Sequence, residues 1–342
     1  MSGFVALVQR LLNQPQMNRI FTAAQKGAEI RVGILDNWGG IDAELLRFTP
    51  HGSCRWGNVA FVPLKNCPQP DFILVLNGPP NDKGMAVNIP PDRLWFASGE
   101  PPAPAYFPYH AGQGEFSSVI CSDPSAATGK KRRYFFEPPL LSTWSVRRNI
   151  EQLEAIHVVE KTRPLSWVTS NLSLLPGHRF RLSFLEKLKQ QVAFDLYGRG
   201  FNPIKDKWDG IAPYRYSIAF ENCIAPLYFT EKLMDCFVCH TMPFYFGAPD
   251  VTKYFPAKSM VQIDPDDPKV FDKIREISNS DLYLERLPFI LEAKELTLKK
   301  YNIFARLAAH FNEAATRRPM PPEKITLQPV NLDWKAVKRG VK

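Results

Sequence analysis

One stretch of the sequence, residues 214–247, predicts a complete strand–helix–strand unit: YRYSIAFENCIAPLYFTEKLMDCFVCHTMPFYFG. The apolar and aromatic run Tyr214–Phe220 is typical of a buried strand, and Met242–Phe246 is typical of the next one. Between them, Thr230 is a suitable N-cap for a helix that continues through the apolar segment Leu233–Val238. We therefore expect a β–α–β unit of an open α/β sheet here.

The helix of this unit begins with Glu231 and Lys232, directly beyond the expected carboxyl end of a strand. Open α/β sheets place their ligands at this edge. The first turn of a helix also has free backbone N–H groups and a positive dipole end, which favour a phosphate. By themselves the two residues are also compatible with a solvent-facing helix start, but their position predicts a phosphate-containing ligand.

An ordered series of motifs surrounds this unit. Its members are Phe220-Glu221-Asn222, Tyr228-Phe229-Thr230-Glu231-Lys232, Pro243-Phe244-Tyr245-Phe246-Gly247-Ala248-Pro249-Asp250, Tyr254-Phe255-Pro256, and Ser259 followed by Met260-Val261-Gln262-Ile263-Asp264. In order and residue type the series resembles glycosyltransferase family 10, the α-1,3/4-fucosyltransferases. The resemblance covers residues 165–267 most strongly.

The resemblance implies an α/β protein of GT-B architecture, in which two Rossmann-like domains face a cleft. It implies an inverting enzyme that moves fucose from GDP-fucose to a hydroxyl of a glycan acceptor. The implied linkage is α-1,3 or α-1,4, on a residue of the N-acetylglucosamine type. GDP-fucose is the donor substrate, and no cofactor or metal ion is expected. The chain looks like the soluble, bacterial-type members of the family rather than the membrane-anchored ones of animals and plants.

The length of 342 residues and the apolar fraction of 45% allow two domains, each with a core of its own. We expect an N-terminal Rossmann-like domain over residues 1–160, on the acceptor side and with the catalytic base. A C-terminal Rossmann-like domain over residues 161–300 is expected to bind the GDP-sugar, and a C-terminal helix and basic tail to follow over residues 301–342. Predicted elements of the first half include helical turns within residues 3–26 and strands at Glu29–Leu35, Asp71–Gly78 and Ser118–Cys121.

Glu100 is the predicted catalytic base. It follows the expected strand Arg93–Ala97 and precedes two prolines. Family members have a similar aromatic-rich strand followed by a glutamate and a proline, and that glutamate is taken as the base. From the residues alone, a carboxylate on a surface turn is the preferred explanation of Glu100, and only the resemblance favours the catalytic role. Glu137, which two prolines also follow, is the competing candidate but lacks the preceding aromatic strand.

The resemblance places five donor-binding residues in the C-terminal half: Arg181, Asn222, Tyr228, Glu231 and Lys232. Arg181 and Lys232 are expected to meet the diphosphate, whose negative charge grows as its bond to the sugar breaks. Glu231 is expected to contact the fucosyl group, because a carboxylate suits an electron-poor ring. The remaining two are expected to contact the nucleotide. Arg179 is the competing candidate for the arginine.

Two further motifs allow chemistry of another kind. Cys236-Phe237-Val238-Cys239-His240 matches the C-x-x-C-H pattern of c-type haem attachment, although both thiols also suit the core face of an apolar helix. The run Asp264-Pro265-Asp266-Asp267 is typical of a turn after a strand rather than of a metal site. The six cysteines are too few for a disulfide scaffold, so reduced thiols are expected.

The net charge of +9 and the pI near 9.2 suit an acidic partner, although a generally basic surface explains them equally well. The basic run 130–133 is expected to be a solvated loop, and no nucleic-acid module accompanies it, so nucleic acid is not an expected partner. The basic tail around Trp334 favours either a weak peripheral membrane contact or a strap across the N-terminal domain. The expected location is cytoplasmic, including the inner face of the cell membrane.

Two other functions fit the same pattern. One is transfer of another sugar from a different sugar nucleotide on the same scaffold. The other is non-catalytic binding of a carbohydrate or an anion. Binding of GDP-fucose and turnover on a glycan acceptor would separate these alternatives from a fucosyltransferase.

Overall fold

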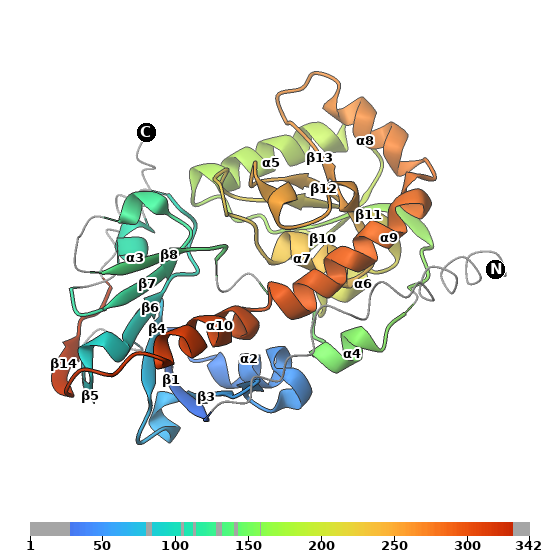
Figure 1. Cartoon of the computed structure of the whole chain (residues 1–342). Helices are drawn as coiled ribbons and strands as arrows, with labels where there is room; N and C mark the ends of the chain where they lie inside the picture. Colours follow the sequence, from blue (N-terminus) through green and yellow to red (C-terminus); the bar gives the residue numbers. More distant parts are fainter. Residues whose placement is uncertain are drawn as a thin grey trace.

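The computed structural model describes residues 28–79, 84–103, 106–111, 114–127, 132–139, 143–157 and 159–330. These residues form two α/β halves, each built around its own main sheet (Figure 1). The helical turns expected within residues 3–26 and the part of the tail around Trp334 lie outside the described residues. In the part of the chain that the structure describes, none of the helices combines the length and the apolar character needed to cross a membrane.

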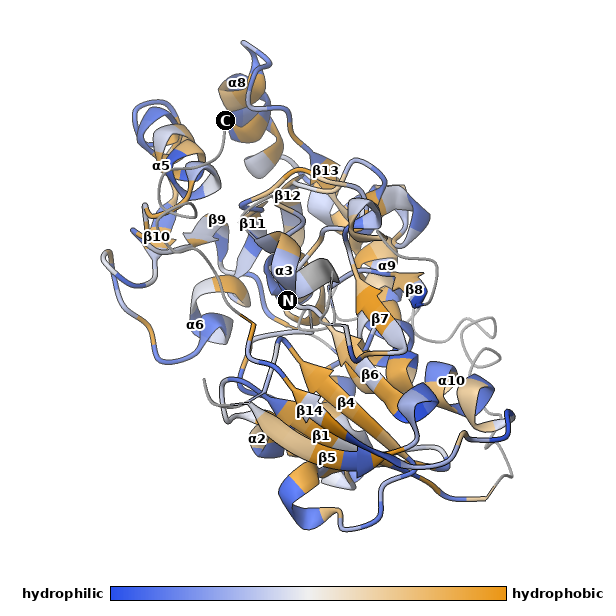
Figure 2. Cartoon of the chain, turned by 90° about the vertical axis from the view of Figure 1, so that its left-hand side faces the viewer, coloured by the Kyte–Doolittle hydropathy of each residue, from blue (hydrophilic) through white to orange (hydrophobic). Residues whose placement is uncertain are grey.

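The first half contains a seven-stranded sheet in the order β2-β3-β1-β4-β6-β7-β8. Its strands are β1 (Ile30–Asp36), β2 (Arg55–Trp56), β3 (Val59–Pro63), β4 (Phe72–Leu76), β6 (Leu94–Ala97), β7 (Ser118–Cys121) and β8 (Arg133–Phe136). All neighbours are parallel except β2 and β3. The strands are strongly hydrophobic, as the orange colour of β1, β4 and β6 shows in Figure 2, because helices and loops cover both faces of a parallel sheet.

The second half contains a five-stranded parallel sheet in the order β10-β9-β11-β12-β13. Its strands are β9 (Arg163–Val168), β10 (Asp195–Tyr197), β11 (Tyr214–Phe220), β12 (Met242–Phe246) and β13 (Val261–Gln262). The predicted strand–helix–strand unit is confirmed, with α7 (Glu231–Val238) between β11 and β12. The chain runs outward in one direction from β9 to β10 and in the other from β11 onward, so the switch point of the sheet lies between β9 and β11.

Helices flank both sheets. In the described residues they are α2 (Ile41–Phe48), α3 (Phe107–Ala111), α4 (Ile150–Glu154), α5 (Pro176–Lys189), α6 (Lys207–Ile211), α7, α8 (Val270–Ser278), α9 (Leu282–Glu295) and α10 (Ile303–Ala315), with a π-helical segment at Leu296–Lys300. Arg133, which was expected to belong to a solvated basic loop, instead begins β8. The sequence analysis placed no elements over residues 37–70, where the structure has α2, β2 and β3.

The end of the described chain returns to the first half. Phe311 of α10 is fully buried and its ring lies 5.0 Å from the rings of Phe72 and Trp95, centroid to centroid. Further on, β14 (Glu323–Leu327) pairs antiparallel with β5 (Met85–Ile89). Sequence analysis missed both of these strands. The strap predicted for the tail around Trp334 stays a prediction, but α10 and β14, which precede that tail, pack on the N-terminal half.

Phe311→Ala tests this packing. The substitution should lower the free energy of unfolding by about 3–5 kcal/mol, because it leaves a cavity among aromatic rings of the first sheet. Leu46→Ala is the control, since Leu46 is 57% exposed and its truncation should change stability by no more than about 0.5 kcal/mol. Urea denaturation of both variants measures the difference. Equal stability of the two variants would show that α10 contributes little to the first half.

Candidate functional site

Two helices begin side by side at the switch point of the second sheet. Helix α5 starts at Pro176 after β9, and α7 starts at Glu231 after β11. A Cβ atom at Gly177 would lie 1.7 Å from the carbonyl oxygen of Asn222, in the loop between β11 and α7. Only glycine permits this approach, which brings the positive ends of two helix dipoles to one place. Such an arrangement favours an anion.

Glu221 is the central buried charge of the site. It directly follows Phe220, the last residue of β11, and is 1% exposed. Its Oε1 accepts hydrogen bonds from the backbone N–H and the hydroxyl of Thr230, both at 2.8 Å, and Lys232 Nζ lies 3.2 Å from Oε2. Burial raises the pKa of Glu221, and the nearby ammonium of Lys232 opposes that rise. The carboxylate therefore holds the first residues of α7 in place.

The roles of Glu221, which the sequence offered only as a member of the motif Phe220-Glu221-Asn222, and of His178 were not predicted from the sequence. A glutamate next to a buried strand and nine residues before Thr230 was the available signal for the first. His178 lies in the first turn of α5, where its Nδ1 accepts a hydrogen bond from the backbone N–H of Leu175. Burial and the cations Arg181 and Lys232 lower the pKa of His178 to about 4, so its ring is neutral near pH 7.

Glu231 and Lys232 form ion pairs at the start of α7. Thr230 caps the helix, and Lys232 Nζ lies 3.3 Å from Glu231 Oε1. Burial favours the neutral form of Glu231, but Lys232 and Lys207 outweigh it and lower the pKa of Glu231 to about 2. Burial likewise works against the charge of Lys232, yet Glu221 and Glu231 raise its pKa above the ordinary value. Both predicted donor residues therefore carry their charges at neutral pH.

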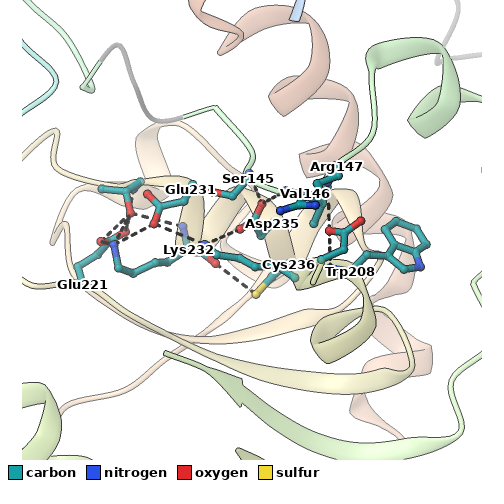
Figure 3. Close-up of polar contacts among 12 residues, drawn as sticks. Ser145, Val146, Arg147, Trp208, Glu221, Glu231, Lys232, Asp235 and Cys236 are labelled. Atoms are coloured by element: carbon teal, nitrogen blue, oxygen red, sulfur yellow. Dashed lines mark hydrogen bonds and ion pairs between the residues drawn. The ribbon is translucent and has the colours of Figure 1, made fainter. Parts of the chain in front are cut away.

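The charged row continues beyond Glu231, as Figure 3 shows. Lys207 Nζ lies 3.6 Å from Glu231 Oε1 and 3.0 Å from Asp235 Oδ2. Asp235 has no exposed side-chain surface, and its Oδ1 accepts hydrogen bonds from the backbone N–H groups of Ser145 and Val146. The row thus connects the start of α7 with the segment that leads from the first half to the second.

Arg181 lies within the site, and Arg179 does not. The Arg181 side chain, from the second turn of α5, donates to Asn222 Oδ1 and to the carbonyl oxygens of Ser170 and Leu172. It is 4% exposed, and its buried Nε has no hydrogen-bond partner. Arg179 lies on the exposed side of α5 and instead donates to the carbonyl oxygens of Ser173 and Leu174, in the loop before that helix. Arg181 and Asn222 are therefore brought together, as the predicted roles require.

Tyr228 is brought close to residues of both halves. It is 5% exposed, and its pKa is raised well above the ordinary value, first by burial and then by the carboxylates Glu221, Glu231 and Glu100. Cys223 Sγ, in the same loop, lies 4.0 Å from the carbonyl oxygen of Pro102. The loop after β11 therefore meets the loop that carries Glu100.

Glu100 follows β6 at the carboxyl edge of the first sheet. Asn77, at the end of β4, donates from Nδ2 to Glu100 Oε1 at 3.1 Å and accepts from the backbone N–H of Gly99 at 2.8 Å. Burial raises the pKa of Glu100. A carboxylate with a neutral hydrogen-bond partner and a raised pKa has the properties of a general base.

Glu137, the competing candidate, is held by two basic side chains of α10. His310 Nε2 lies 2.7 Å from Glu137 Oε1, and Arg306 Nη1 lies 3.4 Å from Oε2. Burial favours its neutral form, but the hydrogen bond from His310 and the charge of Arg306 lower the pKa of Glu137. A carboxylate stabilised in this way is a weak base, so these contacts favour Glu100.

The other motifs lie in the core or in turns. Cys236 and Cys239 are 1% and 0% exposed, which agrees with the core role predicted for them. All six cysteines are unpaired. Within the described ranges, no group of three or more His, Cys, Asp or Glu side chains has the arrangement of a metal site.

Comparison with known proteins gives matches in the same region. Residues 158–286 match the family model of glycosyltransferase family 10 (fucosyltransferase), C-terminal. The alpha-(1,3)-fucosyltransferase FucT of Helicobacter pylori is 39% identical over 74 residues, which make up 22% of this chain and 15% of that protein. The human 4-galactosyl-N-acetylglucosaminide 3-alpha-L-fucosyltransferase 9 is 30% identical over 135 residues, 37% of each chain. The matched regions therefore span well under half the length of these relatives.

Solved structures match over most of the chain. A crystal structure of an alpha1,3-fucosyltransferase with GDP-fucose has a TM-score of 0.53 and 20% identity, and the match covers 88% of this chain and 95% of that one. An alpha1,3-fucosyltransferase with GDP gives a TM-score of 0.53 at 19% identity, over 87% and 94% of the two chains. This likeness concerns the fold, and it confirms the predicted α/β class and GT-B architecture.

Gly177→Ala tests the close approach of α5 to the loop after β11. The added methyl group should force the two apart, at a cost of about 1–3 kcal/mol in stability. GDP should bind about tenfold more weakly, because both helix starts shift. Gly114→Ala is the control, since among the described residues its new Cβ would meet only Arg132 Nη2, at 3.9 Å. Wild-type GDP affinity in Gly177→Ala, measured by calorimetry, would contradict the importance of this contact.

Proposed function

We propose, from the match of residues 158–286 to the family model of glycosyltransferase family 10, that the protein is an inverting transferase that moves fucose from GDP-fucose to a hydroxyl of a glycan acceptor. The observation that carries the proposal is the meeting of two helix starts, Lys232 and Arg181 at the switch point of the second sheet. The names of the similar proteins, which include fucosyltransferases with GDP-fucose and with GDP, support this choice of donor.

The diphosphate of the donor is assigned to the cationic side of the site. Lys232 supplies a compact charge and Arg181 a planar set of donors, of which Nε has no partner in the described protein. As the bond to the sugar breaks, charge grows on the departing diphosphate, and these groups are already in place to stabilise it. Protein cations thus take the role that a metal ion plays in other transferases.

The sugar and the nucleotide are assigned to the residues around this cationic side. Glu231 remains ionised at neutral pH, so its carboxylate can stabilise positive charge that develops on the fucosyl ring. Asn222 and Tyr228 are assigned to the nucleotide, because they lie on the same loop between β11 and α7. Arg181 holds Asn222 in position.

Glu100 is assigned the role of base. It comes from the other half, and its charge acts on Tyr228, so the two halves contribute to one site. In an inverting transfer the base removes the proton of the acceptor hydroxyl while the oxygen attacks the anomeric carbon and the diphosphate leaves with the bonding electrons. The Asn77 hydrogen bond fixes the carboxylate for this step.

The acceptor is proposed to be a glycan that ends in a residue of the N-acetylglucosamine type, fucosylated in an α-1,3 or α-1,4 linkage. The name of the human relative, a 4-galactosyl-N-acetylglucosaminide 3-alpha-L-fucosyltransferase, supports this acceptor class. A screen of N-acetyllactosamine-type and unrelated glycans with GDP-fucose tests it. Thermal-shift measurements with GDP-fucose, GDP-mannose and UDP-glucose test the donor separately, because a ligand at a hundredfold excess over its dissociation constant stabilises the fold by about 2.7 kcal/mol. Protection by GDP-fucose without turnover would favour a non-catalytic binding protein.

Lys232→Ala and Arg181→Ala should each weaken binding of GDP-fucose by roughly tenfold to a hundredfold, with an equal or larger loss of transfer. Each removes a charged hydrogen-bond partner, typically about 1.5–3 kcal/mol. Lys232→Arg should restore only part of the activity, because a planar fork replaces a compact charge. Lys189→Ala, which breaks a surface ion pair with Glu186 on the same helix α5, is the control and should bind normally. Wild-type donor affinity in both site variants would remove this assignment.

Glu100→Gln should reduce kcat by about 10² to 10⁴ while GDP-fucose affinity changes less than about threefold. The amide keeps the shape of the side chain but cannot take the proton. Because burial raises the pKa of Glu100 above 4.5, the base is ionised only above that raised value, and wild-type kcat should fall as the pH drops through it. This acid limb should be absent from the residual activity of Glu100→Gln. Glu137→Gln should instead lower stability with little loss of kcat, and the reverse pattern would identify Glu137 as the base.

A further inference from the structure

Lys207 lies between two carboxylates of α7. Its ammonium is 3.6 Å from Glu231 Oε1 and 3.0 Å from Asp235 Oδ2. The two acids are four residues apart, so they project from the same face of the helix, where like charges repel. Their side chains are 28% and 0% exposed, which leaves little water to screen the repulsion. A cation from α6 at this position therefore allows both acids to ionise.

Asp235 fixes Lys207 in turn against the segment that enters the second half. Its Oδ1 accepts from Ser145 and Val146 N–H groups at 2.5 and 3.2 Å, while Oδ2 faces the ammonium. Both oxygens of the Asp235 carboxylate therefore have partners. Rotation of this side chain would break hydrogen bonds in a buried environment. Asp235 thus contacts the Lys207 ammonium from one direction, and Glu231 contacts it from another.

We propose that Lys207 is a positioning residue of the donor site: held by Asp235, its ammonium keeps the Glu231 carboxylate charged and fixed at the start of α7. This inference rests on the proposed function for the role of Glu231, but the electrostatic part of it stands on the distances alone. Sequence analysis named no residue of α6, because that short helix carries none of the family motifs.

Other charged groups also act on Glu231, and they set what happens when Lys207 is removed. Lys232 lies on the same helix and contacts Glu231 directly. The other two groups are acids: Glu221, just after β11, and Asp235, one turn further along α7. Without Lys207, one cation would face three acids in a buried row. The pKa of Glu231, now about 2, should then rise, because the remaining acids and burial both favour its neutral form.

Lys207→Met removes the charge and keeps most of the length of the side chain. In protein labelled with 13C at the glutamate carboxyl carbons, the Glu231 signal is assigned by its absence from Glu231→Gln. We expect no titration of this signal above about pH 4 in the wild type and a midpoint between about pH 4 and 7 in Lys207→Met. Transfer from GDP-fucose should fall by about tenfold to a hundredfold in kcat at pH 6 and recover in part at pH 8, whereas GDP, which lacks the sugar, should bind within about threefold of wild type.

Three further variants separate positioning from general structural damage. Asp235→Asn removes the carboxylate that holds Lys207 but keeps the ammonium, so the titration midpoint of Glu231 should lie between those of the wild type and Lys207→Met. Lys207→Arg should restore the low pKa of Glu231 and part of the kcat. Arg148→Gln breaks the ion pair with Asp206 that also holds the entering segment, and both the Glu231 titration and kcat should remain near wild type.

An unchanged Glu231 titration in Lys207→Met would overturn the proposal, and so would an equal shift of that titration in Arg148→Gln. The titration does not require turnover. If no acceptor is fucosylated by the wild type, the proposed function fails while the titration still decides the role of Lys207. If Lys207→Met shifts the titration but leaves kcat at pH 6 unchanged, Glu231 is not the fucosyl contact and the positioning role is wrong.

Discussion

A carboxylate buried at the end of a strand is the constraint on which the second half of this protein depends. Glu221 is 1% exposed, so each of its oxygens requires a partner. Thr230 and Lys232 supply those partners, and Gly247 leaves the space, since a Cβ there would lie 2.6 Å from Glu221 Cγ. The loop between β11 and α7 therefore has to return to the end of the strand before the helix begins.

From this single acid the charges alternate along a row: Glu221, Lys232, Glu231, Lys207 and Asp235. Removing such a row of charges from water costs free energy, and a packed apolar core of similar volume is often at least as stable. The arrangement is therefore better explained by what it does to the helix start than by stability. It keeps a cation and an anion side by side, both charged at neutral pH, at the place where two helix dipoles favour an anion.

The sequence predicted the second half more fully than the first, for a physical reason. The strands β11 and β12 and the cap at Thr230 are local features, set by neighbours within a few residues, and all were predicted correctly. Strand β14 and its partner β5 could not be predicted in this way, because they are more than 200 residues apart and each is short and partly polar. The roles of Glu221 and Lys207 were missed for a related reason. The effect of a charged side chain depends on its burial and on partners from other elements.

The return of α10 to the first sheet limits how the two halves can move. Helix α9 is attached to the second half, where the hydroxyl of Tyr216 accepts from the backbone N–H of Tyr283, and α10 is attached to the first, where Arg306 and His310 hold Glu137. The π-helical segment Leu296–Lys300 lies between these attachments. Rotation of one half against the other therefore acts on this segment, while Asp235 fixes the chain at Ser145 to the second half. Glu137 thus serves the site indirectly, because it makes α10 and the sheet that carries Glu100 move as one body.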